Sequence, residues 1–308
     1  MRTQTFDDFD AFAASIRDVD SKMLLRNPNQ RTWSVSSVDL GRIDVQLGKL
    51  GSGNIAQGQL RPDGYMLYLP LTDGVEYTAN GQVLGPSTFA ILEPGCEFCI
   101  STRVEHDWCV AFVPTKMLQP DSGAPASGSC YVSNSQPLAA HRFRETLLEI
   151  FSTAGQCAPF ESSRAAGIAA EEVLHLARQV VPTTHPEELH GDGRPRFSRD
   201  KIVVRCMELM DQQRDRPLTV RDLVATSGVS ERTLRSVFNE YFGIGPSQYL
   251  QLRHLHTVRR ALREAESDDT TVSQVLVEHG EWAFSRFASR YQKLFGERPS
   301  QTLRASYR

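Results

Sequence analysis

The feature that most constrains this 308-residue chain is an internal repeat near its C-terminus. Matching residues lie 52 positions apart up to a shared glycine and 53 positions apart beyond it. The clearest pairs are Thr219 with Thr271, Gly228 with Gly280, Leu234 with Phe287, Phe238 with Tyr291, and Pro246 with Pro299. A constant shift of one residue is what a single insertion in one copy would leave. The pattern therefore predicts two copies of one small structural unit.

Each copy has the residues of a helix-turn-helix. In the first copy, Thr219 is expected to cap a short helix, Gly228 to form a left-handed turn, and Ser230 to cap a second helix. The buried faces of the two second helices are predicted to hold Leu234, Phe238 and Phe242 in the first copy and Phe287, Tyr291, Leu294 and Phe295 in the second. The repeat therefore predicts two similar recognition helices.

The opposite faces of these two helices carry donors suited to base edges and phosphates. The predicted DNA-contacting residues are Arg232, Arg235, Ser236 and Asn239 in the first copy and Ser285, Arg286, Ser289, Arg290 and Gln292 in the second. The charge distribution agrees, because residues 199–308 hold 18 Lys and Arg against 14 Asp and Glu, whereas residues 1–198 have a net charge of −7. The C-terminal part is therefore expected to bind double-stranded DNA.

Two segments, SERTLRSVFNEYFGIGPSQYLQLRHLHTVRRAL and HGEWAFSRFASRYQKLFGERPSQTL, resemble the C-terminal domain of AraC/XylS-family regulators. The resemblance covers about residues 199–306 and implies two helix-turn-helix units joined by a long helix at about 246–266. This chain departs from the family pattern at Val224 and Leu276, where alanine is usual, and at Glu281, where an apolar residue is usual. We expect these changes to affect the second unit more than the first.

The N-terminal part has a β pattern. Residues 31–113 form short runs rich in β-branched and aromatic residues, broken by turn residues, as is typical of a barrel or sandwich. A Pro-, Ser- and Gly-rich stretch at 119–136 is predicted to be a loop. The family resemblance implies a cupin-like barrel that binds an effector and helps the protein dimerise. The expected fold class is thus α+β in two domains. Residues 1–181 are expected to form a cupin-like β-barrel at about 31–113, with flanking helices at about 138–181. A linker at 182–196 would lead to an all-α DNA-binding domain with two helix-turn-helix units at 197–308.

Five residues of the β region are candidates for an effector pocket that would take an anionic or aromatic molecule. They are Trp33, Arg61, Tyr68, Phe98 and Trp108. The competing interpretation is that these side chains form the barrel core, and the sequence does not identify the effector.

An enzyme is not expected, and neither is a cofactor or a metal. A cupin metal site needs two or three histidines with a glutamate, and the β region holds one histidine, His106, which we expect to be an ordinary structural residue. No nucleophile elbow, phosphate loop or dinucleotide motif occurs. Two alternatives stay open: a redox-responsive DNA-binding regulator that uses Cys96 and Cys99, and a cupin-type enzyme with a helical appendage.

The leading hypothesis is a transcription regulator, an activator, controlled by a small-molecule effector. It would act as a homodimer and contact RNA polymerase as well as DNA. No run of 18 apolar residues occurs, and acidic residues interrupt the N-terminal stretch where a signal peptide would be apolar. A cytoplasmic protein without a membrane partner is therefore expected.

Overall fold

The computed structural model describes residues 1–85, 88–118, 128–133, 137–156, 159–181, 199–213, 216–265 and 270–305. The chain divides into two compact units, residues 1–193 and 194–308. The linker predicted at 182–196 lies outside the described residues. Among the helices of the described ranges, none combines the length and the apolar character needed to span a membrane.

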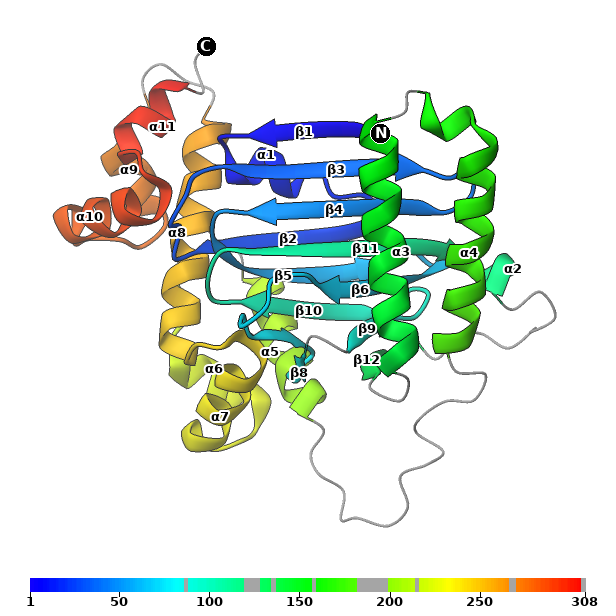
Figure 1. The fold of residues 1–308 in the computed structure, drawn as a ribbon. Helices are drawn as coiled ribbons and strands as arrows, with labels where there is room; N and C mark the ends of the chain where they lie inside the picture. The colour runs from blue at the N-terminus through cyan, green and yellow to red at the C-terminus, as the bar shows by residue number, and fades with distance from the viewer. Residues whose placement is uncertain are drawn as a thin grey trace. The chain divides into compact units, whose positions relative to one another are not determined.

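The N-terminal unit is built on two antiparallel sheets (Figure 1). The larger sheet has the strand order β1 (Arg2–Phe6), β3 (Trp33–Asp39), β4 (Asp44–Leu50), β11 (His106–Pro114), β6 (Gly64–Pro70), β9 (Phe89–Leu92) and β12 (Cys130–Ser133). The smaller sheet has the order β2 (Val19–Arg26), β5 (Gly53–Leu60), β10 (Glu97–Thr102), β7 (Tyr77–Ala79) and β8 (Gln82–Leu84). Shorter elements are α1 (Phe9–Ala13), α2 (Thr115–Leu118) and the 3-10 turn Phe160–Ser162.

The larger sheet is covered on both faces. Its outer face packs against helices α3 (Pro137–Gln156) and α4 (Arg164–Val180), where Leu67 and Leu69 join the same apolar cluster as Phe143 and Leu147. Its inner face turns toward the smaller sheet. Because neighbouring residues of a strand point to opposite faces, a strand covered on both sides must be apolar throughout. Strand β6 has this character, since all its residues are buried.

The N-terminal unit differs from the prediction in two ways. The two sheets keep separate edges and form a jelly-roll sandwich, which is compatible with a cupin-like fold but is not a closed barrel. The β region also extends beyond 31–113. Strands β1 and β2 precede it, and β12 lies in the stretch predicted to be a loop, where it pairs with β9.

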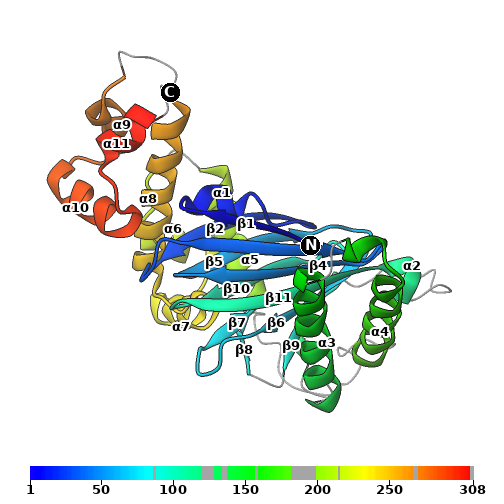
Figure 2. The same cartoon turned by 45° about the horizontal axis from the view of Figure 1, so that its top comes forward.

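The C-terminal unit is entirely helical in its described residues. Its helices are α5 (Arg199–Gln212), α6 (Val220–Ser227), α7 (Glu231–Phe242), α8 (Pro246–Glu264), α9 (Val272–Glu278), α10 (Phe284–Phe295) and α11 (Pro299–Ala305). We call α6 with α7 the first head and α9 with α10 the second head. Figures 1 and 2 show the two heads at opposite ends of α8.

Helix α8 contributes to the core of both heads. Near its start, the Tyr249 ring lies 4.6 Å from that of Phe242 in the first head. Further along, the His256 ring lies 5.0 Å from that of Phe295 in the second head. The Arg259 guanidinium stacks over that same ring at 4.4 Å. One continuous helix therefore holds both heads.

Candidate nucleic-acid interface

The first head has the local structure that its sequence predicts. Thr219 caps α6 in a capping box with Asp222, and Ser230 caps α7 by accepting a hydrogen bond from the Thr233 amide at 3.2 Å. Between them, Gly228 has φ 71°, a left-handed conformation that glycine adopts without steric cost. These features end one helix and start the next at a sharp angle.

The second head repeats this arrangement with one extra residue in its turn. Thr271 forms the equivalent capping box with Gln274, and Gly280 has φ 72°. Gly228 is followed by two residues before α7, whereas Gly280 is followed by three before α10. The inserted residue therefore lies in the second turn. The predicted buried residues of both recognition helices are buried, and the unusual Leu276 is buried as well.

The exposed face of α7 carries all four of its predicted DNA-contacting residues. Arg232, Ser236 and Asn239 lie opposite the buried Leu234 and are exposed. Arg235 lies at the edge of this face, where its guanidinium pairs with Glu231 at 3.0 Å. The first head thus presents a polar, donor-rich surface with the dimensions of a helix that fits the major groove.

The exposed face of α10 carries four of its five predicted residues: Ser285, Arg286, Ser289 and Gln292. Arg290 is placed differently. It matches Val237 of the first head, which is buried, and its guanidinium pairs with Glu281 at 3.4 Å. Arg290 is therefore half-buried and held in an ion pair beside α8, and its DNA contact stays a prediction.

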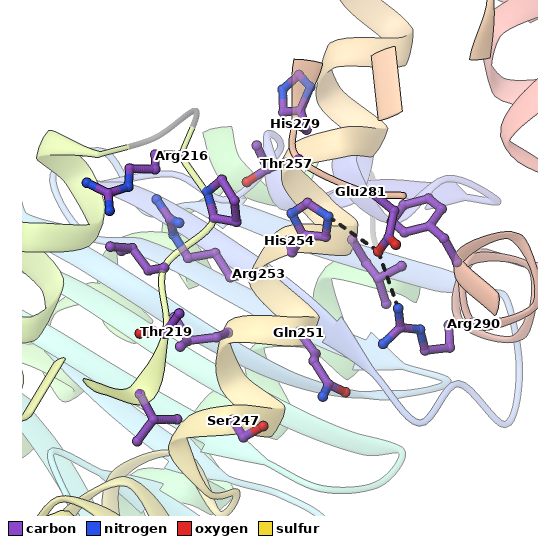
Figure 3. A pocket seen from close by; sticks show the side chains of 17 residues that line it. Arg216, Thr219, Ser247, Gln251, Arg253, His254, Thr257, His279, Glu281 and Arg290 are labelled. Carbon is purple, nitrogen blue, oxygen red and sulfur yellow. Dashed lines mark hydrogen bonds and ion pairs between the residues drawn. The ribbon is translucent and has the colours of Figure 1, made fainter. Parts of the chain in front are cut away.

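Glu281 links the start of α10, the middle of α10 and helix α8 (Figure 3). The Glu281 side chain is 13% exposed and accepts a hydrogen bond from the amide of Ala283 at 2.8 Å. Ala283 is the N-cap residue of α10, and its own side chain offers no capping group. Glu281 also pairs with Arg290 on α10 and lies 3.9 Å from His254 on α8. Burial lowers the pKa of His254, although the Glu281 carboxylate acts in the opposite direction, so the imidazole ring is largely neutral at pH 7. The positive charge that pairs with the Glu281 carboxylate therefore comes from Arg290.

The two charges replace an apolar pair. At the offsets of the repeat, Glu281 and Arg290 match Val229 and Val237 of the first head. Removing one charge alone should leave the other partly buried without its partner, whereas replacing both should restore the chemistry of the first head.

We expect Glu281→Val or Arg290→Val to lower the free energy of unfolding by about 1–2 kcal/mol, a modest value because Arg290 is 38% exposed and partly screened by solvent. The double substitution should recover most of this loss. Hydrogen exchange of α10 in the full chain would measure all three variants. Additive effects of the two single substitutions would contradict the pairing.

A groove of about 380 Å³ runs along α8 between the two heads. Figure 3 shows Arg216 and Thr219 on one side of it, with His254 and Glu281 on the other. At its rim the segment before α6 approaches the turn of the second head, because a Cβ atom on Gly280 would lie 2.7 Å from Cγ of Pro217. We expect this close approach and α8 together to set how the second head sits against the first.

Three of the five effector-pocket candidates lie together. Tyr68, Phe98 and Trp108 line a small, largely apolar cavity of about 40 Å³ between the two sheets. Trp33 lies elsewhere, where its Nε1 donates to Ser52 Oγ at 2.8 Å. Arg61 is on the surface and pairs with Asp18 and Asp63, because its position after β5 takes it out of the sandwich.

The cavity limits what could bind in this conformation. A volume of this size holds roughly one or two water molecules. An effector of several heavy atoms would therefore require side chains or strands to move apart. Among the described residues that line the cavity, none is basic, so the lining itself does not favour an anionic effector.

His106 is a hydrogen-bonded residue of the core. Its Nδ1 donates to the carbonyl oxygens of Ser52 at 3.1 Å and Val104 at 2.9 Å, and burial lowers its pKa to about 4. Within the described ranges, no three His, Cys, Asp or Glu side chains gather as a metal site would require.

Cys96 and Cys99 are both buried thiols. Burial raises the pKa of each thiol to about 12, so both are protonated at neutral pH. Because thiol oxidation and disulfide exchange proceed through the thiolate, this environment argues against the redox alternative.

Comparison with known proteins agrees with this architecture. A family model described as a helix-turn-helix domain matches residues 223–305. The XylDLEGF operon transcriptional activator of Pseudomonas putida is 27% identical over 139 residues, which cover 45% of this chain and 40% of the activator. The probable thc operon regulatory protein of Rhodococcus erythropolis is 28% identical over 110 residues, 36% of this chain and 33% of that protein.

Among solved structures, a probable AraC family transcriptional regulator from Rhodopseudomonas palustris is 28% identical, with 34% of this chain and 96% of that chain covered and a TM-score of 0.32. The AraC-like transcriptional activator CuxR is 13% identical, and the match covers 90% of this chain and 100% of CuxR with a TM-score of 0.45. The chain spans about 40% of the length of the curated relatives it matches first. The C-terminal unit, with two capped helix-turn-helix heads on one long helix, thus matches a helix-turn-helix domain model and is similar to the corresponding part of XylS/AraC-type transcriptional activators.

Proposed function

We propose that this protein is a sequence-specific, DNA-binding transcriptional activator controlled by a small-molecule effector. The observation that carries the proposal is the pair of matched heads, each with an exposed, donor-rich recognition helix on the same connecting helix. The names of its P. putida relatives, which describe transcriptional activators, support activation rather than repression.

In the proposed mechanism, α7 and α10 enter successive major-groove segments. Arg232, Ser236 and Asn239 would read base edges in one segment, and Ser285, Ser289 and Gln292 would do so in the other. Basic residues beside these faces would contact phosphates, which fixes the position of each head but carries little sequence information.

Selection of bound sites from a random-sequence duplex pool by the full chain, at two salt concentrations, tests the proposal. We expect enrichment of two blocks about 10 base pairs apart, with an affinity that falls steeply as salt increases. Failure to enrich any sequence at either salt concentration would contradict sequence-specific binding.

The proposal also includes a regulatory mechanism. Effector bound between the two sheets would change their separation and so shift the population of DNA-binding arrangements. We further propose that the protein acts as a homodimer, which would bring four heads to repeated half-sites, and that it contacts RNA polymerase at the promoter. Sedimentation of the full chain with and without its selected site would test the dimer, because a monomer on DNA would refute it.

Arg232→Ala should weaken binding to the selected site by roughly 1–3 kcal/mol and relax preference at one base pair. Arg235→Ala should instead weaken binding to all sequences alike, because Arg235 lies at the edge of the recognition face. Titrations against the site and its single-base variants distinguish the two results. Arg304→Ala, on α11, serves as the matched control for loss of one exposed arginine.

A further inference from the structure

We propose that Trp282 is an apolar specificity residue of the second head, which contacts the 5-methyl group of thymine in the major groove. The inference rests on the proposed DNA-binding function and deepens it. It adds a contact type that the polar residues of α7 and α10 cannot supply, because a methyl group neither donates nor accepts hydrogen bonds.

Trp282 is 75% exposed, whereas the other two tryptophans, Trp33 and Trp108, are buried. Phe284, two residues later, is 36% exposed. A large aromatic ring held in water contributes little to folding, so the Trp282 ring keeps most of its apolar area available for a contact with DNA.

The first head has no residue equivalent to Trp282. If the residues before the two recognition helices are paired, Ala283 matches Ser230 and Glu281 matches Val229, which leaves Trp282 as the inserted residue. The turn of the second head therefore differs from the turn of the first by one exposed indole ring. Any contact it makes distinguishes the DNA block read by the second head from the block read by the first.

Trp282 lies two residues before α10, and the exposed Ser285 and Arg286 follow it in the first helical turn. In helix-turn-helix proteins, the N-terminal residues of the recognition helix contact base edges. A ring at this point meets the groove edge beside those donors, and the thymine methyl is the apolar feature exposed there. The occupant that fits this surface is thus an A·T base pair within the second block.

The experiment uses the full chain and the site that it selects. Each thymidine of the second block is replaced in turn by deoxyuridine, which removes the methyl group and keeps base pairing. We expect one or two positions at which this replacement weakens wild-type binding roughly three- to five-fold, as loss of one buried methyl predicts. Replacements in the first block should not depend on Trp282.

Variants of Trp282 then assign the contact. Trp282→Ala should weaken binding to the thymidine site and abolish the difference between thymidine and deoxyuridine, while Trp282→Leu should retain part of that difference. Val277→Ala, which truncates an exposed apolar side chain on α9, is the matched control and should keep the full difference.

The outcomes are separable. If the chain selects a site but Trp282→Ala still distinguishes thymidine from deoxyuridine, or no position distinguishes them, this inference is wrong and the proposed function stands. Normal DNA binding by Trp282→Ala with reduced transcription would also overturn it, and would assign the ring to a protein partner. If no site is selected at all, the proposed function itself fails.

Discussion

Replacing Phe287 by alanine is expected to lower the free energy of unfolding by roughly 3–5 kcal/mol. The Phe287 side chain is fully buried, and its ring lies edge-on at 5.8 Å from that of His254 on α8. It lies at the same distance from the Tyr291 ring one turn along α10. Truncation would leave a cavity where α10 joins α8, which would loosen the second head.

Phe284→Ala is the matched control, because it makes the same chemical change on the same helix at a partly exposed site. It should cost less than about 1 kcal/mol. Urea unfolding of the full chain, combined with hydrogen exchange of α10, measures both variants. Equal effects of the two substitutions would show that the buried face of α10 is assigned incorrectly.

The two heads could be predicted from sequence because their signals are local. The capping residues Thr219 and Thr271 act on amides within the next turn, and Gly228 adopts a backbone conformation that glycine favours intrinsically. The repeat added independent support, since each signal occurs twice at a constant offset. Prediction here needed no knowledge of distant contacts.

The missed strands depend on distant partners instead. Strand β1 is polar in sequence, and it becomes a strand by pairing with β3. Strand β12 lies beside Pro-, Ser- and Gly-rich residues, and its partner β9 is about 40 residues earlier. Local pattern carries little information about such pairings, so both were absent from the prediction.

The surroundings of several candidate site residues could not be predicted for a similar reason. Arg290 lies at the edge of the buried face of α10, where sequence period alone cannot show whether a charge meets solvent or a partner. Comparison of the two copies contained the signal, because Arg290 matches the buried Val237 and Glu281 matches Val229. In the β region, Trp33 and Arg61 were selected by residue type, and only strand register shows that they lie outside the cavity that Tyr68 lines.

Gly280→Ala is expected to destabilise the second head by roughly 2–5 kcal/mol, through two separate effects. A left-handed φ of 72° disfavours any residue with a Cβ atom by about 1–2 kcal/mol. In addition, the new Cβ would lie 2.7 Å from Cγ of Pro217. Because the proline ring is rigid and cannot rotate away, this clash adds an overpacking cost of about 1–3 kcal/mol. Relief of this clash should also displace the second head from the first.

Gly228→Ala isolates the first effect, because Gly228 has nearly the same φ and an added Cβ there would have no described neighbour within 4 Å. It should cost only about 1–2 kcal/mol. Pro217→Ala removes Cγ. When it is combined with Gly280→Ala, the loss in free energy of unfolding caused by Gly280→Ala should fall close to the loss caused by Gly228→Ala, as measured by urea unfolding of the full chain.

On the selected DNA, Gly280→Ala should weaken binding to two-block sites more than binding to sites that keep the first block alone. If Gly280→Ala and Gly228→Ala are equally destabilising and Pro217→Ala gives no rescue, then the two heads do not meet at this point and α8 alone sets their spacing.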